Sequence, residues 1–240
     1  MSVLTPWAMA AVVGIVLAGS LVQGVSGSGF GVVTAPALLM VAPQLVPTTL
    51  LCLATVACGF GAWRERTHID WAFVSRCLIA AVPGTATGLV AVHLVAAPTL
   101  EVGIATAVIL GGVAGLCGAR VPLSHRGTVA AGFLSGALNY AAALPGPPLA
   151  LTYRTPDAAQ IRATLSAVFT MMSLATSIVV TTIGRGGIEN LKAAALLAAP
   201  LAVGIAFGRR IAPWVSATWT ARAGMSLSVL AGLGLLLNNV

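Results

Sequence analysis

The stretch GSLVQGVSGSGFGVVTAPALLMVA at residues 19–42 decides how this chain folds, because a glycine-rich break and a proline interrupt apolar sequence. A second stretch, AGFLSGALNYAAALPGPPLALTY at residues 131–153, repeats the pattern with a proline-rich break. An offset of 112 residues aligns Gly24 with Gly136 and Pro36 with Pro148. Interrupted apolar segments at corresponding places in two halves of a membrane protein are typical of a solute-binding site.

The composition indicates a membrane protein. With 58% hydrophobic and 7% charged residues, a chain of 240 residues has too little polar surface to cover a soluble globule. Apolar stretches of spanning length recur, and the charged residues fall almost wholly between them. The net charge of +7 comes from scattered basic residues, without the basic stripe of a nucleic-acid-binding protein. We therefore expect the lipid bilayer as a partner and no nucleic acid.

The reactive side chains give no support to an enzyme or a metal site. The cysteines lie in apolar segments without CxxC spacing, and the histidines form no HxxxH or HExxH pattern. These residues are Cys52, Cys58, Cys77, Cys117, His68, His93 and His125. No nucleophile with a nearby base is evident within the apolar segments. We expect no catalysis, no metal and no cofactor.

Two short apolar segments, residues 32–42 and 147–153, decide the topology. A helix over the first would cover about 16 Å, roughly half of the hydrocarbon core. If both short segments count as crossings, the chain has ten segments and its basic residues divide ten against two; otherwise they divide seven against five. The positive-inside rule favours ten segments. The ten are Arg64, Arg66, Arg76, Arg120, Arg126, Arg154, Arg162, Arg209, Arg210 and Arg222, opposite Arg185 and Lys192.

The expected fold is an all-α polytopic membrane protein with two inverted-topology repeats. Each repeat has about five helical segments, including one short broken helix, and an odd number of crossings inverts the second repeat. The repeats are residues 1–120 and 121–240, joined by the polar stretch ARVPLSHRG in one compact membrane domain. The N-terminus lacks the basic region of a signal peptide, so we expect the first segment to be retained. The arginine-rich loops are expected in the cytoplasm and both termini in the periplasm.

The order of the motifs resembles that of the TauE/SafE sulfite-exporter family. The motifs are GVSGSGFG at 24–31, TAPAL at 34–38, Ile69-Asp70, LPGPP at 144–148 and IRATL at 161–165, and the resemblance covers nearly the whole chain. It implies a carrier in the bacterial inner membrane that exports small anions such as sulfite, sulfonates or sulfoacetate. The alternatives are an anion channel that uses the same site and a non-transporting membrane protein.

The breaks themselves predict an anion site. Backbone N–H groups freed at a break need polar partners, and a helix N-terminus attracts anions. Thr34 is expected to cap the short helix with Pro36 in its first turn, and Gly146, Pro147 and Pro148 to act likewise in the second copy. The candidate substrate-binding residues are Gly24, Ser26, Gly27, Ser28, Gly29, Gly31, Thr34, Pro36, Asn139, Tyr140, Gly146, Pro147, Pro148 and Arg162. Arg162 either supplies a charge for the anion or extends to the lipid headgroups.

The same glycines and prolines could instead serve only close helix packing and kinks. For the pairs Gly84 with Gly88, Gly111 with Gly115 and Gly204 with Gly208 we expect helix contacts, and glycine-rich faces could also join copies into a homo-oligomer. All the acids lie in loops or at segment ends, which argues against a carboxylate-based coupling site. They are Glu65, Asp70, Glu101, Asp157 and Glu189.

Overall fold

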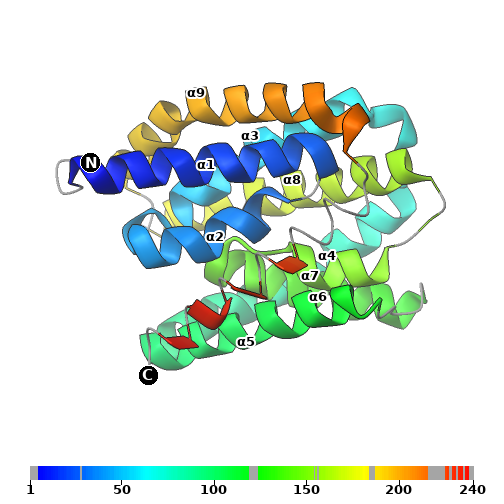
Figure 1. The fold of residues 1–240 in the computed structure, drawn as a ribbon. Helices are drawn as coiled ribbons and strands as arrows, with labels where there is room; N and C mark the ends of the chain where they lie inside the picture. Colours follow the sequence, from blue (N-terminus) through cyan, green and yellow to red (C-terminus); the bar gives the residue numbers. More distant parts are fainter. Residues whose placement is uncertain are drawn as a thin grey trace.

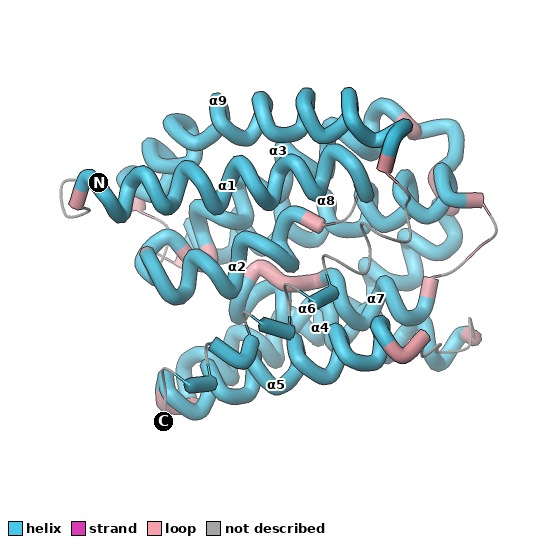
Figure 2. The backbone as a smooth tube through the Cα atoms, viewed as in Figure 1, coloured by secondary structure: helices cyan, strands magenta, loops and turns pink. Residues whose placement is uncertain are grey.

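The computed structural model describes residues 5–27, 29–118, 124–153, 155, 157–183, 187–215, 225–226, 229–230, 232–234 and 236–237. Within these ranges every regular element is a helix (Figures 1 and 2). Five helices are long and apolar enough to cross a membrane: α1 (Pro6–Ser26), α4 (Trp71–Leu94), α5 (Ala97–Leu116), α8 (Ala158–Thr182) and α9 (Ile188–Ile211). The prediction of an all-α polytopic membrane protein is confirmed.

Both predicted short segments are short helices. They are α2 (Phe30–Val41) and α7 (Gly146–Thr152), and each follows a break after a longer helix, α1 or α6 (His125–Ala142). α2 folds back against α1. Helices α1 and α9 lie on one side of α2 and α7, and α5 lies on the other side (Figure 1). The remaining long helix is α3 (Thr48–Arg64), which packs against α8 in the interior. Most of the expected connection between the halves lies outside the described residues.

Charged residues from distant parts of the chain collect at one end of the helix bundle. Glu65, at the end of α3, forms an ion pair with Arg162 near the start of α8. Arg64, Glu65 and Arg162 are also the charged neighbours of Arg209 in the last turn of α9. The ten-segment topology predicts that these arginines lie at the same end. Arg120, Arg154, Arg185 and Arg222 lie outside the described residues.

Several pairs of helices pack closely together at glycines. A Cβ built on Gly24 would lie 2.6 Å from the Ile205 carbonyl oxygen, in the contact of α1 with α9. A Cβ on Gly88 would lie 2.6 Å from the Ala137 carbonyl oxygen, in the contact of α4 with α6. Gly84, Gly204 and Gly208 lie in the same two contacts, Gly111 meets Pro147, and Gly115 meets Met225. The prediction that the paired glycines serve helix contacts is confirmed.

The expected repeat relates the two glycine-rich contacts to each other. Under that expectation α6 is the counterpart of α1, and α9 is the counterpart of α4. α1 packs against α9, and α6 packs against α4, so each first helix meets the fourth helix of the other half. α3 packs against its own counterpart α8, and α2 touches its counterpart α7.

Candidate substrate site between two helix breaks

The two breaks meet in the interior around a small cavity. A Cβ on Gly31 would lie 2.9 Å from the Ala143 carbonyl oxygen, and a Cβ on Gly146 would lie 3.1 Å from Val32 Cγ2. The cavity between them has a volume of about 20 Å³, enough for a single water molecule. Its lining residues are Gln23, Phe30, Gly31, Val32, Ala54, Cys58, Ala143, Leu144, Pro145, Gly146, Phe169 and Ser173. The two breaks therefore face each other, as the repeat in the sequence predicts.

Gln23 is the polar centre of the first break. Its Oε1 accepts hydrogen bonds from the backbone N–H groups of Gly29 (2.9 Å) and Phe30 (3.0 Å). Its Nε2 donates to the Gly27 carbonyl oxygen (2.9 Å) and contacts Cys58 Sγ at 3.6 Å. Two converging N–H donors require an acceptor, so the amide oxygen must point at the start of α2. A neutral amide oxygen thus occupies the position that suits an anionic oxygen.

Sequence reasoning missed Gln23, although a signal was present. It is a lone glutamine inside an apolar helix, directly before Gly24, and it is almost completely buried. A buried amide inside a membrane-spanning helix needs partners that only the folded chain provides. The N–H groups of Gly29 and Phe30, at the start of α2, lie beside this side chain and donate to it.

The predicted roles of Thr34 and Pro36 are wrong. The short helix α2 begins at Phe30, so Thr34 lies inside it and its Oγ1 donates to the Phe30 carbonyl oxygen (2.6 Å). Gln23 takes the capping role, because its side chain reaches the first amides from the preceding helix. Pro36 also lies inside the helix and not in its first turn. A proline there leaves the Val32 carbonyl, at the cavity, without its usual helical donor.

The second break is poorer in donors than the first. Ala143 adopts a left-handed conformation (φ 55°), and its N–H donates to the Asn139 carbonyl oxygen (2.9 Å). α7 begins at Gly146 with Pro147 and Pro148 in its first turn, as predicted. Proline has no N–H group, so two of the first amides of this helix cannot bind a ligand. The second break therefore closes the cavity without matching the first break as an anion site.

Asn139 and Tyr140 do not line the cavity. Asn139 donates through Nδ2 to Thr176 Oγ1 (2.9 Å) and accepts from the hydroxyl of Ser173 (3.5 Å), which does line it. Tyr140 is buried in the apolar core that also contains Phe30. Asn139 thus reaches the cavity only through Ser173.

The remaining candidates lie on the side of the first break that faces the arginines. Gly24 contacts α9, and Ser26 donates to the Val22 carbonyl oxygen (2.8 Å) within α1. Gly27 has a left-handed conformation (φ 76°), and its carbonyl oxygen accepts a hydrogen bond from Ser166 (2.8 Å). Ser28 lies outside the described residues. None of these described residues lines the cavity.

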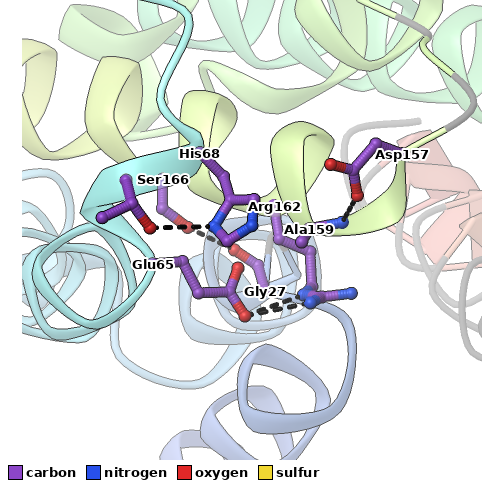
Figure 3. Close-up of polar contacts among 8 residues, drawn as sticks. Gly27, Glu65, His68, Asp157, Ala159, Arg162 and Ser166 are labelled. Carbon is purple, nitrogen blue, oxygen red and sulfur yellow. Dashed lines mark hydrogen bonds and ion pairs between the residues drawn. The ribbon is translucent and has the colours of Figure 1, made fainter.

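Arg162 has a partner that the sequence did not reveal. Its Nη2 and Nε donate to the same oxygen of Glu65, at 2.9 Å and 3.3 Å (Figure 3). Its side chain lies against Gly27, where a Cβ would approach Arg162 Cγ to 2.8 Å. Arg162 therefore pairs with a carboxylate beside the break, which neither of the two sequence-based interpretations included.

Two of the sequence motifs meet at this end of the bundle. Asp70, which caps α4 by accepting from the Phe73 N–H, also accepts from the hydroxyl of Tyr153 (3.3 Å). The backbone N–H of Asp70 donates to Thr164 Oγ1 (3.0 Å), within the IRATL motif. These bonds hold the start of α4 against α8.

In the described part of the chain, His, Cys, Asp and Glu form no group of three or more that could hold a metal ion.

Comparison with known proteins gives one result. The family model described as "Sulfite exporter TauE/SafE" matches residues 11–235 of the chain. No curated protein and no solved structure matches the chain. The family match includes both breaks and the Gln23 site.

Proposed function

The chain belongs to the sulfite exporter TauE/SafE family, and we propose that it is a secondary transporter that exports a small oxyanion, such as sulfite, a sulfonate or sulfoacetate. The observation that carries this proposal is the pair of N–H groups, of Gly29 and Phe30, that hold the Gln23 oxygen at the cavity between the breaks. The transporter family supports a membrane transport function and no enzymatic activity.

In this proposal the anion takes the place of the Gln23 oxygen. Free N–H groups at a helix start stabilise a negative charge, and the effect is stronger where water is excluded. When an oxyanion binds Gly29 and Phe30, Gln23 can rotate and donate its own N–H groups to the same anion. Exchange of one acceptor for another leaves no backbone donor unsatisfied in either state.

The size of the cavity implies a conformational change. A sulfur oxyanion is larger than the volume of about 20 Å³ between the breaks, so the breaks must separate when it binds. We propose that residues 1–120 and 121–240 are inverted repeats that rock against each other to expose the site to each side in turn. The exchanged contacts of α1 with α9 and α6 with α4 support this symmetry.

The proposed location is the bacterial inner membrane. The gathering of Arg64, Arg162 and Arg209 at one end supports placing that end in the cytoplasm and both termini in the periplasm. Within the described residues, no carboxylate lines the cavity. We therefore propose that transport is driven by the anion gradient and the membrane potential, or by a proton carried on the substrate.

A substitution of Gln23 tests the proposed site. In Gln23→Glu a carboxylate takes the position of the amide oxygen, so the fold keeps its cap while the anion meets a competing charge. We expect purified Gln23→Glu in proteoliposomes to lose most of the sulfite efflux seen with the wild type. Gln44→Glu is the matched control, because Gln44 is exposed on a short helix away from the cavity.

The outcomes separate the proposals. Efflux by Gln23→Glu at the wild-type rate would contradict the site. Ionic currents far above carrier turnover would identify an anion channel, and no anion movement by the wild type would favour a non-transporting membrane protein. Exchange of the anion across the membrane in both directions, at the turnover of a carrier, would support a carrier.

A further inference from the structure

We infer that Arg209 and Arg162 form a second oxyanion site, beside the first break at the arginine-rich end, and that Glu65 occupies it until a solute anion replaces its carboxylate. A role of this site in transport rests on the proposed function, whereas its ability to bind an anion does not. The site lies outside the cavity between the breaks, since none of these three residues lines that cavity.

Both arginines lie near the end of α1. The side chain of Arg162 lies over Gly27, where a Cβ would lie 2.8 Å from its Cγ. The backbone nitrogen of Arg209 would lie 3.1 Å from a Cβ on Gly24. Gly24 and Gly27 are about one helical turn apart, where α1 ends at the break that Gln23 organises. The two arginines therefore stand at the same edge of the break, one from α8 and one from α9.

Arg209 has an unused hydrogen-bond donor. Its Nη1 is buried and has no hydrogen-bond partner among the described residues. The guanidinium lies over the ring of Phe60, with Cζ 4.4 Å from the ring centroid, which fixes its position but leaves the donor unpaired. A buried donor without an acceptor is costly, and for a guanidinium an oxyanion is the strongest acceptor. This observation points to a ligand.

The local charge favours one more anion. Among the described residues, the charged neighbours of Arg209 are two arginines, Arg64 and Arg162, and one carboxylate, Glu65. Both hydrogen bonds from Arg162 go to the same oxygen of Glu65. Side-chain exposures of 35% for Arg162 and 27% for Glu65 leave the pair within reach of solvent. A solute oxyanion can therefore replace the carboxylate and bridge Arg162 to Arg209.

The test measures sulfite binding by titration calorimetry on purified protein in a detergent free of phospholipid. Glu65→Gln removes the competing carboxylate, so we expect binding to tighten about tenfold, the size expected for charge-assisted hydrogen bonds. Glu189→Gln is the control, because Glu189 is an exposed acid at the start of α9, away from the cluster. Arg209→Gln should weaken binding about tenfold in the Glu65→Gln protein. Arg210→Gln, at the exposed neighbouring position, should leave it unchanged.

Further arms assign the effect to this site. The same titrations are repeated in the Gln23→Glu background, where the site between the breaks is blocked. Tightening by Glu65→Gln that persists there supports the arginine site, and tightening that disappears overturns it. If Arg209→Gln does not fold, Arg209→Lys keeps the charge but loses the planar fork and should still weaken binding.

The remaining outcomes concern the occupant and the proposed function. Displacement of bound sulfite by phosphatidylglycerol would make a lipid headgroup the occupant and overturn a solute site. Unchanged binding in Glu65→Gln, with normal efflux by the wild type, would overturn the second site alone. Tighter binding in Glu65→Gln, without efflux by the wild type, would support the second site and contradict the transport function.

Discussion

Gly31 and Ala143 approach so closely that a Cβ on Gly31 would lie 2.9 Å from the Ala143 carbonyl oxygen. This contact joins the two breaks, which are more than a hundred residues apart in the chain. The atom that faces Gly31 is a backbone oxygen. Rotation of a neighbouring side chain therefore cannot make room for a larger side chain at Gly31. Close contact of the breaks therefore depends on glycine at this position.

We expect Gly31→Ala to destabilise the protein by about 1–3 kcal/mol, the usual cost of overpacking, and to lower sulfite efflux. Gly146→Ala should cost less, because its added Cβ would meet the movable side chain of Val32 at 3.1 Å. Gly59→Ala is the control, since its Cβ would make an ordinary contact with Thr170 at 3.5 Å. Thermal unfolding in detergent checks the order, and equal stability of all three variants would contradict it.

Gly27→Ala is expected to combine two costs. Its left-handed backbone (φ 76°) costs about 1–2 kcal/mol for alanine, and its Cβ would also meet the side chain of Arg162. Gly118→Ala isolates the first cost, because Gly118 has φ 73° and no atom within 4 Å of the added Cβ. Denaturant unfolding should therefore show that Gly27→Ala is less stable than Gly118→Ala. The reverse order would contradict the close contact of Arg162 with Gly27.

The glycine contacts of the two halves predict matching variants. Gly24→Ala and Gly88→Ala should each destabilise the protein by about 1–3 kcal/mol, because each added Cβ would lie 2.6 Å from a carbonyl oxygen of the facing helix. Gly103→Ala should be neutral or slightly stabilising, since nothing lies within 4 Å and alanine favours the helix. A large loss of stability in Gly103→Ala would indicate a contact with another copy of the chain, as in the expected homo-oligomer.

Tyr153→Phe should remove about 0.5–1.5 kcal/mol of stability by deleting the hydrogen bond to Asp70. Chemical denaturation of both proteins in detergent measures this difference, and equal stability of the two would contradict the assigned bond.

The sequence was sufficient to locate the breaks, because glycine and proline act on the local backbone. α2 and α7 lie where the two interruptions predict them, and Asp157 caps α8 by accepting from Ala159 N–H, as its cap-like surroundings indicate. The division of basic residues also placed Arg64, Arg162 and Arg209 at the same end of the bundle, where the structure has them. These features depend on neighbours in the chain or on charge summed over whole loops.

The details of the site could not be predicted, because they depend on contacts between distant segments. Thr34 looks like a helix cap in isolation, but the side chain of Gln23 in α1 accepts from the first amides of α2 instead. The pairing of Arg162 with Glu65 joins residues 97 apart in sequence, across α8 and α3. Only the fold shows that Arg162 has a carboxylate partner and that Arg209 keeps an unpaired donor.

The two prolines at the start of α7 give the two halves unequal numbers of amide donors for an anion. Pro147 and Pro148 remove amide donors from the second break, whereas Gly29 and Phe30 keep theirs in the first. An anion held by the first break alone would remain bonded to the same half of the protein throughout a transport cycle. Selectivity would then be set by the first half, and substitutions in the second half would change the speed of transport without changing which anion is chosen.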